Sequence, residues 1–131
     1  MKFIPRSILQ LGIRGLGIGT ILFGVAPIIA PRRFAQLFGL PSQGAAASVA
    51  IRSVGVRDAV IGAGLLLTIN DAKNNGYWLL ARGASDGGDA VSCAIALRRD
   101  RRNLRLWLLA GVAAAAAGVD LSLYLLWQNK V

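Results

Sequence analysis

Four long apolar segments, separated by short polar or proline-containing stretches, constrain this chain more than any other feature of its sequence. A helix of about 20 predominantly apolar residues is long enough to cross the hydrocarbon core of a bilayer. The segments therefore predict an all-α fold, an integral membrane four-helix up-down bundle with short loops between successive helices. In this prediction the whole chain is a single transmembrane domain, with spans at about residues 8–30, 45–69, 76–97 and 104–127.

Composition agrees with a membrane protein, because 55% of the residues are hydrophobic and only 16% are charged. The net charge of +9 raises the question of nucleic acid. However, the basic residues stand beside apolar segments, where they can contact anionic lipid headgroups and set topology. We therefore expect the lipid bilayer, and no nucleic acid, as a partner. Histidine is absent and Cys93 is the single cysteine, so the sequence predicts no metal site, no disulfide within the chain and no cofactor.

The glycines of the first span favour close helix packing over a nucleotide-binding loop. Their spacing is not Gly-x-Gly-x-x-Gly, and no strand precedes them. Gly15 and Gly19 instead have the small-xxx-small spacing that lets two membrane helices approach closely. We expect these two glycines to face another helix.

Proline and polar residues predict where the helices end. Pro27 and Pro31 are expected to end the first helix, because proline disrupts a helix interior. The segment Phe34–Leu40 is amphipathic, which is typical of a short helix lying on the membrane surface. Residues 70–76 read as a polar turn before the third span.

The distribution of basic residues predicts the orientation of the bundle. With four spans, the side that holds both termini carries four basic residues, whereas the other side carries seven. Cytoplasmic loops of membrane proteins are enriched in lysine and arginine. The loop Arg98–Arg105 is therefore predicted to lie in the cytoplasm, in a multi-pass protein of the inner or plasma membrane if the source is bacterial.

Charged residues inside the spans are the second main feature. Charges are expensive at this depth, and those that occur are usually functional or paired with a neighbouring helix. The spans hold equal numbers of both signs, four arginines (Arg14, Arg52, Arg57 and Arg82) against four aspartates (Asp58, Asp86, Asp89 and Asp120).

Depth along the helices predicts how these charges pair. Counting residues from the arginine-rich side at ~1.5 Å per residue sets Arg52 level with Asp89 and Arg57 level with Asp86. We therefore expect both aspartates to face the second span.

The same count predicts a separate structural pair on the other two spans. Arg14 and Asp120 come out at the same depth on the first and fourth spans. We expect these two side chains to bind each other.

The third span concentrates this polar character, since several of its polar residues share one helical stripe. Its glycines Gly83, Gly87 and Gly88 leave room beside the carboxylates. We therefore predict a buried site between the second and third spans, formed by Arg52, Arg57, Asp58, Arg82, Asp86 and Asp89.

Two polar motifs resemble those of a family of small four-helix integral membrane proteins of unknown function, near the DoxX-like membrane proteins. They are Arg52-Ser53-Val54-Gly55-Val56-Arg57-Asp58-Ala59 followed by Gly62, and Arg82-Gly83-x-x-Asp86-x-x-Asp89. The resemblance covers most of the chain. It implies the fold and the importance of these positions, and it supplies no activity.

Three functions fit these residues, and the sequence leaves the choice open. The first is binding of a small molecule with a polar or anionic headgroup, or a lipophilic one, at the buried arginine and aspartate site. Independent transport by so small a chain would require a homo-oligomer.

The second function is a membrane-embedded acid–base enzyme, a hydrolase, isomerase or cyclase that acts on a lipophilic substrate. Its candidate catalytic residues are Asp86, Asp89, Arg82 and Arg57, in a carboxylate–arginine–carboxylate set similar to that of small epoxide hydrolases. Such an enzyme should have a closed cavity beside the two aspartates. The third function is a structural or accessory subunit, in which the charge pairs fix the helices to one another.

Overall fold

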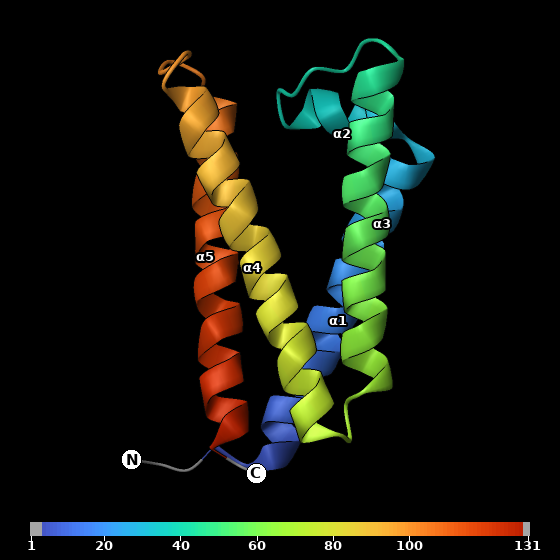
Figure 1. Cartoon of the computed structure of the whole chain (residues 1–131), viewed down its shortest axis with the longest axis vertical. Coiled ribbons are helices and arrows are strands. Elements are labelled where there is room, and N and C mark those ends of the chain that lie inside the picture. The colour runs from blue at the N-terminus through green and yellow to red at the C-terminus, as the bar shows by residue number, and fades with distance from the viewer. Residues whose placement is uncertain (1–3, 130–131) are drawn as a thin grey trace.

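The computed structural model describes residues 4–129, and this part of the chain contains helices and no strand. The predicted all-α class is therefore confirmed. Four long helices lie within a few residues of the four predicted spans, and a short helix joins the first two (Figure 1). The helices are α1 (Arg6–Ile29), α2 (Pro31–Leu37), α3 (Ala45–Leu67), α4 (Ala72–Leu97) and α5 (Leu104–Gln128).

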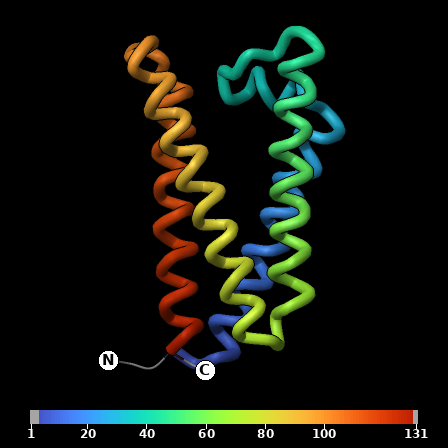
Figure 2. The backbone as a smooth tube through the Cα atoms, in the orientation of Figure 1, coloured from blue at the N-terminus to red at the C-terminus, as the bar shows by residue number. Residues whose placement is uncertain are grey.

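The long helices form two pairs, α1 with α3 and α4 with α5. They run alternately up and down, and the two pairs meet at the end of the molecule that holds both termini (Figure 1). Toward the other end the pairs separate, and α2 lies between them there (Figure 2). The arrangement is therefore two packed arms whose long helices meet at one end.

Apolar side chains from all four long helices form the core at the joined end. Trp127 is fully buried there, and its indole nitrogen donates a hydrogen bond of 3.2 Å to the carbonyl of Ala72. The buried members of this core come from every long helix and, in the case of Ile69, from the turn after α3: Leu9, Ile13, Leu65, Ile69, Leu79 and Trp127.

The segment around α2 links the arms at the separated end. Arg105 at the start of α5 donates a hydrogen bond of 3.0 Å to the carbonyl of Gln36 in α2. Leu40, just after α2, packs against a small core formed by Cys93, Leu97 and Leu106 of α4 and α5. The two arms are thus in contact at both ends of the molecule.

Glycines allow the close approach of α1 and α3, although not the glycines that the sequence predicted. A Cβ atom placed on Gly24 would lie 2.6 Å from the carbonyl oxygen of Gly55, and one on Gly62 would lie 2.6 Å from the carbonyl oxygen of Gly17. A Cβ atom on Gly15 or Gly19 would meet nothing within 4 Å, so the predicted contact through these two glycines is wrong.

The glycines that do meet are seven residues apart on each helix. Residues seven apart lie on the same face of a helix, about two turns from each other, so the two glycine contacts form one continuous line between α1 and α3. We call Gly17, Gly24, Gly55 and Gly62 the glycine seam.

The two prolines near the end of α1 do not both end it. Pro27 lies inside α1 and is buried against α3, where its ring would contact a Cβ atom on Gly55. Pro31 begins α2, because a proline in the first turn lacks only an N–H group that has no partner there. The predicted short helix Phe34–Leu40 exists, but it begins at Pro31 and ends at Leu37.

Residues 70–76 are mostly helical rather than a turn, because Asp71 caps the start of α4. Its carboxylate accepts a hydrogen bond of 3.1 Å from the backbone N–H of Asn74, and a second from the side chain of Asn74. These hydrogen bonds hold the pKa of Asp71 below its usual value. The carboxylate is therefore charged at neutral pH, where a negative charge near a helix N-terminus is favourable.

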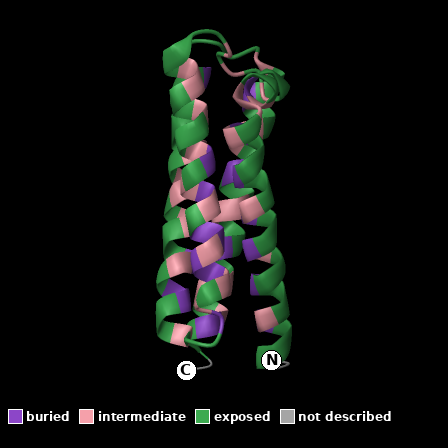
Figure 3. Cartoon of the chain, turned by 90° about the vertical axis from the view of Figure 1, so that its right-hand side faces the viewer, coloured by how far each residue is buried: buried purple, intermediate pink, exposed green. Residues whose placement is uncertain are grey.

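The outer surface of the helices is largely apolar. Buried residues concentrate on the inward faces, and the outward faces are exposed (Figure 3). The exposed side chains include large apolar residues on every long helix, among them Leu22, Val56, Val91 and Leu108. By length and composition, α1 and α5 could each cross a membrane. The charges inside α3 and α4 make those two helices more polar.

Candidate functional site

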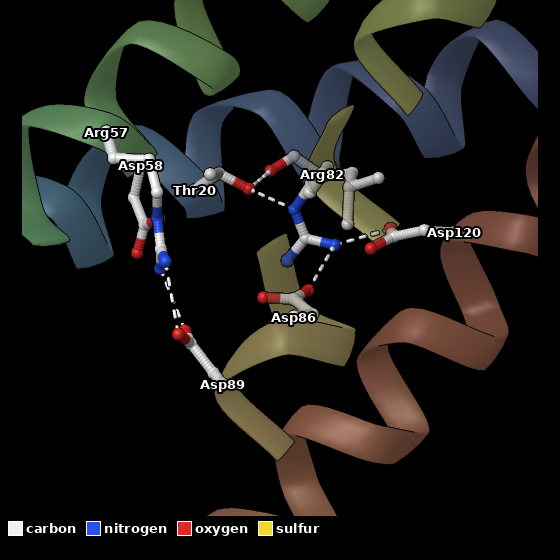
Figure 4. Close-up of polar contacts among 8 residues, drawn as sticks. Thr20, Arg57, Asp58, Arg82, Asp86, Asp89 and Asp120 are labelled. Atoms are coloured by element: carbon white, nitrogen blue, oxygen red, sulfur yellow. Dashed lines mark hydrogen bonds and ion pairs between the residues drawn. The ribbon is translucent and has the colours of Figure 1, made fainter. Parts of the chain in front are cut away.

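The structure brings six of the eight charges within the predicted spans into two ionic groups, each with one arginine and two aspartates (Figure 4). We call Arg57, Asp58 and Asp89 the outer ionic group, because the side chains of Arg57 and Asp89 are partly exposed. We call Arg82, Asp86 and Asp120 the inner ionic group, because it is more deeply buried.

The outer ionic group joins α3 to α4. Arg57 donates two parallel hydrogen bonds to the carboxylate of Asp89, from Nη1 to Oδ1 at 3.1 Å and from Nη2 to Oδ2 at 2.8 Å. Its Nε donates to Oδ1 of Asp58 at 2.9 Å. The planar guanidinium suits this two-point contact. The Arg57 and Asp89 side chains remain 33% and 38% exposed, so solvent or a ligand can reach them.

The inner ionic group joins α4 to both α5 and α1. Arg82 donates from Nη1 to Oδ1 of Asp120, and the same nitrogen lies 3.3 Å from Oδ2 of Asp86. Its Nε donates to the hydroxyl of Thr20 at 2.8 Å, and that hydroxyl donates to the carbonyl of Leu16 at 2.7 Å. Asp120 is completely buried. One arginine therefore connects three helices in the interior.

These partners differ from the predicted pairs on the second and third spans. Asp89 binds Arg57 and not Arg52, and Asp86 lies beside Arg82 of its own helix. Depth alone does not fix how each helix is rotated about its axis, and the spacing of four residues lets Arg82 reach Asp86 directly.

The predicted pair of Arg14 with Asp120 is also wrong, because Arg82 binds Asp120. The buried residues of α1 lie on a stripe through Ile13, Gly17 and Thr20, and Arg14 is exposed next to that stripe. Equal depth was therefore not enough to bring Arg14 to α5.

Arg52 belongs to neither ionic group and lies on the surface of α3. Its Nε donates to the carbonyl of Ile28 at 3.2 Å, and its Nη1 donates to the hydroxyl of Ser48 at 3.0 Å. These contacts hold its guanidinium over the junction of α1 and α2.

Two open grooves share Arg52 as a lining residue. We call the first, of about 520 Å³, the α3 groove; it is lined by Val49, Arg52, Ser53, Val56 and Arg57. We call the second, of about 400 Å³, the arginine groove; it is lined by Ala30, Pro31, Arg32, Arg33, Ser48 and Arg52.

The site predicted from the sequence did not include Arg32 or Arg33. Both line the arginine groove with Arg52, and neither groove has an acidic lining residue. Within residues 4–129, none of these three arginines forms an ion pair. Two adjacent arginines directly after Pro31 were the feature of the sequence that could have indicated this site.

Of the three glycines of α4 predicted to leave room beside the carboxylates, only Gly83 faces another helix closely. A Cβ atom on Gly83 would lie 3.4 Å from Cβ of Asp120, so Gly83 lets α5 bring Asp120 close to Arg82. Cβ atoms on Gly87 and Gly88 would meet nothing within 4 Å. The two grooves described above are lined by neither Asp86 nor Asp120.

Comparison with protein-family models decides the family. Residues 17–123 match the model described as a domain of unknown function (DUF4267). The chain belongs to this family. The DUF4267 region contains both ionic groups, the glycine seam and both grooves, whereas Arg14 lies outside it. Neither the comparison with curated proteins nor that with solved structures finds a match. The expected proximity to the DoxX-like proteins stays a prediction.

Proposed function

We propose that this DUF4267 protein crosses the membrane four times and binds an amphipathic molecule with an anionic headgroup in the arginine groove. The observation that carries the proposal is the gathering of Arg32, Arg33 and Arg52 in one groove without an acidic residue. Guanidinium groups bind phosphate and carboxylate oxygens through two parallel hydrogen bonds. The ligand class is therefore a phosphate- or carboxylate-bearing lipid.

Helix lengths support four crossings. The 23 residues of α3 and the 26 residues of α4 extend roughly 35 and 39 Å at 1.5 Å per residue, which exceeds the hydrocarbon thickness of about 30 Å. The aspartates inside both helices are paired with arginines. The apolar outer faces would contact lipid, with the loop Arg98–Arg105 in the cytoplasm.

The position of the arginine groove suits a headgroup. Arg52 lies seven residues from the start of α3, so it is about 10 Å along that helix. Arg32 and Arg33 are in the first turn of α2, at the end of the α1 span. This places the groove near the boundary between hydrocarbon and headgroups, where cationic side chains attract anionic lipid.

The α3 groove provides the surface for the apolar part of the ligand. It continues from Arg52 along α3, and its valines Val49 and Val56 are 63% and 52% exposed. At its far end Arg57 already binds two carboxylates, so its positive charge is matched. The anionic group is therefore held at Arg52 rather than in the ionic groups, which revises the predicted ligand site.

The other two functions have less support as the main role. An acid–base enzyme needs substrate-sized space beside Asp86 and Asp89, and neither groove is lined by an aspartate. Of the candidate catalytic residues only Arg57 lines a groove, and it is already paired with Asp58 and Asp89. The ion pairs do connect helices, α3 with α4 and α4 with α5. This stabilising role is compatible with binding at the arginine groove.

Lipid binding by variants of the groove tests the proposal. We expect phosphatidic acid to bind the purified protein more tightly than phosphatidylcholine with the same acyl chains, as measured by native mass spectrometry. Arg52→Gln should weaken phosphatidic acid binding by about tenfold or more, because a hydrogen bond to a charged group contributes about 1.5–3 kcal/mol. Arg33→Gln should act in the same direction.

Arg102→Gln is the matched control, because it removes the same charge from an exposed loop residue that lies outside the groove. It should leave the affinity within about twofold of the wild type, since surface charges contribute little individually. Equal losses in Arg52→Gln and Arg102→Gln would show nonspecific attraction by net charge and contradict the proposal.

A further inference from the structure

The inner ionic group contains one guanidinium and two carboxyl groups, so one negative charge is unmatched when both aspartates are ionised. The side chains of Arg82 and Asp86 are 16% and 20% exposed, and that of Asp120 is 0% exposed. An unmatched charge at such a position is strongly unfavourable, and two carboxyl groups in one site commonly share a single proton instead.

Hydrogen bonding within this group is also incomplete. Among the described residues, Oδ2 of Asp86 and Oδ2 of Asp120 are buried and have no hydrogen-bond partner. Both carboxyl groups lie against the same nitrogen, Nη1 of Arg82 (Figure 4). A proton on one of these carboxyl groups would make its oxygen a hydrogen-bond donor, and the second carboxyl group could then accept that hydrogen bond.

The surrounding helices supply no other cation for this site. From α1 the contact is the uncharged hydroxyl of Thr20. The neighbouring charges on α3 and α4 are those of the outer ionic group, where Arg57 already faces Asp58 and Asp89. That group has the same composition, but the side chains of its Arg57–Asp89 pair are 33% and 38% exposed, so solvent can stabilise its extra charge. A metal ion such as Ca²⁺ takes six or more oxygen ligands, which two aspartates beside a guanidinium do not offer.

We propose that Asp86 and Asp120 share one exchangeable proton beside Arg82, so that the inner ionic group is a proton-binding site. With the proton bound, the group has one positive and one negative charge and is neutral as a whole. Release of the proton from the carboxyl group leaves two carboxylates and one guanidinium in the interior. This site is separate from the arginine groove, and the inference does not depend on lipid binding there.

Infrared spectroscopy of the full chain in a detergent without ester groups tests this site. The wild type should show, at neutral pH, the C=O stretching band of one protonated carboxyl group, shifted in D₂O and lost when the pH is raised. Asp86→Asn and Asp120→Asn should each remove the band, because the remaining aspartate is then matched by Arg82.

Two variants are controls for the assignment. Asp58→Asn changes the outer ionic group, and Asp100→Asn changes an exposed loop residue; both should keep the band. Absence of the band in the wild type at neutral pH overturns the proposal, and so does its loss in Asp58→Asn. If the inner-group variants fail to fold, the wild-type titration and the Asp58→Asn spectrum still decide.

Discussion

Replacing Arg82 with glutamine should prevent the protein from folding stably in detergent at neutral pH. The change leaves Asp86 and Asp120 in the interior without their cation, and it removes the donor to Thr20. Removing one partner of a buried ion pair typically costs about 3–5 kcal/mol, a large part of the total stability of a domain. Thermal unfolding and size-exclusion chromatography of the purified variant measure this loss.

Arg14→Gln is the matched control, since it makes the same chemical change at an exposed arginine of α1. Its unfolding temperature should stay close to that of the wild type. Adding Asp120→Asn to Arg82→Gln should recover part of the stability, because it removes a stranded carboxylate. If Arg82→Gln proved as stable as Arg14→Gln, the inner ionic group would not hold the helices together.

Alanine at the glycine seam should be the next most damaging change. A Cβ atom on Gly24 would lie 2.6 Å from both the backbone nitrogen of Ala59 and the carbonyl oxygen of Gly55. Since backbone atoms on both helices would have to move, we expect Gly24→Ala to lower the free energy of unfolding by about 1–3 kcal/mol. Gly55→Ala should behave in the same way, and unfolding in detergent measures both.

Gly15→Ala and Gly19→Ala provide the comparison on the same helix. Both positions have open space around the added methyl group. Alanine also favours a helix over glycine by up to about 1 kcal/mol, so these variants should be neutral or more stable. Equal losses at Gly19 and Gly24 would contradict the packing of α1 on α3.

The apolar segments were sufficient to predict the four long helices, because their lengths and breaks are visible directly in the sequence. At two places the helix boundaries of the structure differ from the predicted ones. Residues 70–76 were predicted to be a turn because they are polar, but Asp71 caps a helix that begins at Ala72. Pro27 was predicted to end the first helix, but it lies inside α1. In both cases a residue typical of a break has a partner or a neighbour that only the folded chain provides.

The membership of the ionic groups was predicted better than their pairing. All six residues of the two groups were expected at the buried site or in the structural pair, but Arg14 and Arg52 were assigned partners that they do not contact. Residue counting gives depth, whereas the rotation of each helix depends on packing such as the glycine seam. Whether these residues bind a ligand or act in catalysis stays a prediction.

The proposed function requires that the long helices cross a bilayer, and it places the arginine-rich end in the cytoplasm. Single cysteines placed in the Cys93→Ala protein test this directly, because Cys93 is the only cysteine of the chain. Asn70→Cys and Asp100→Cys lie at opposite ends of α4 and are both exposed in the structure. In spheroplasts, a maleimide that does not cross membranes should label Asn70→Cys at once and Asp100→Cys only after permeabilisation. Equal labelling of both positions before permeabilisation would contradict the membrane-spanning arrangement, and the reverse pattern would contradict its orientation.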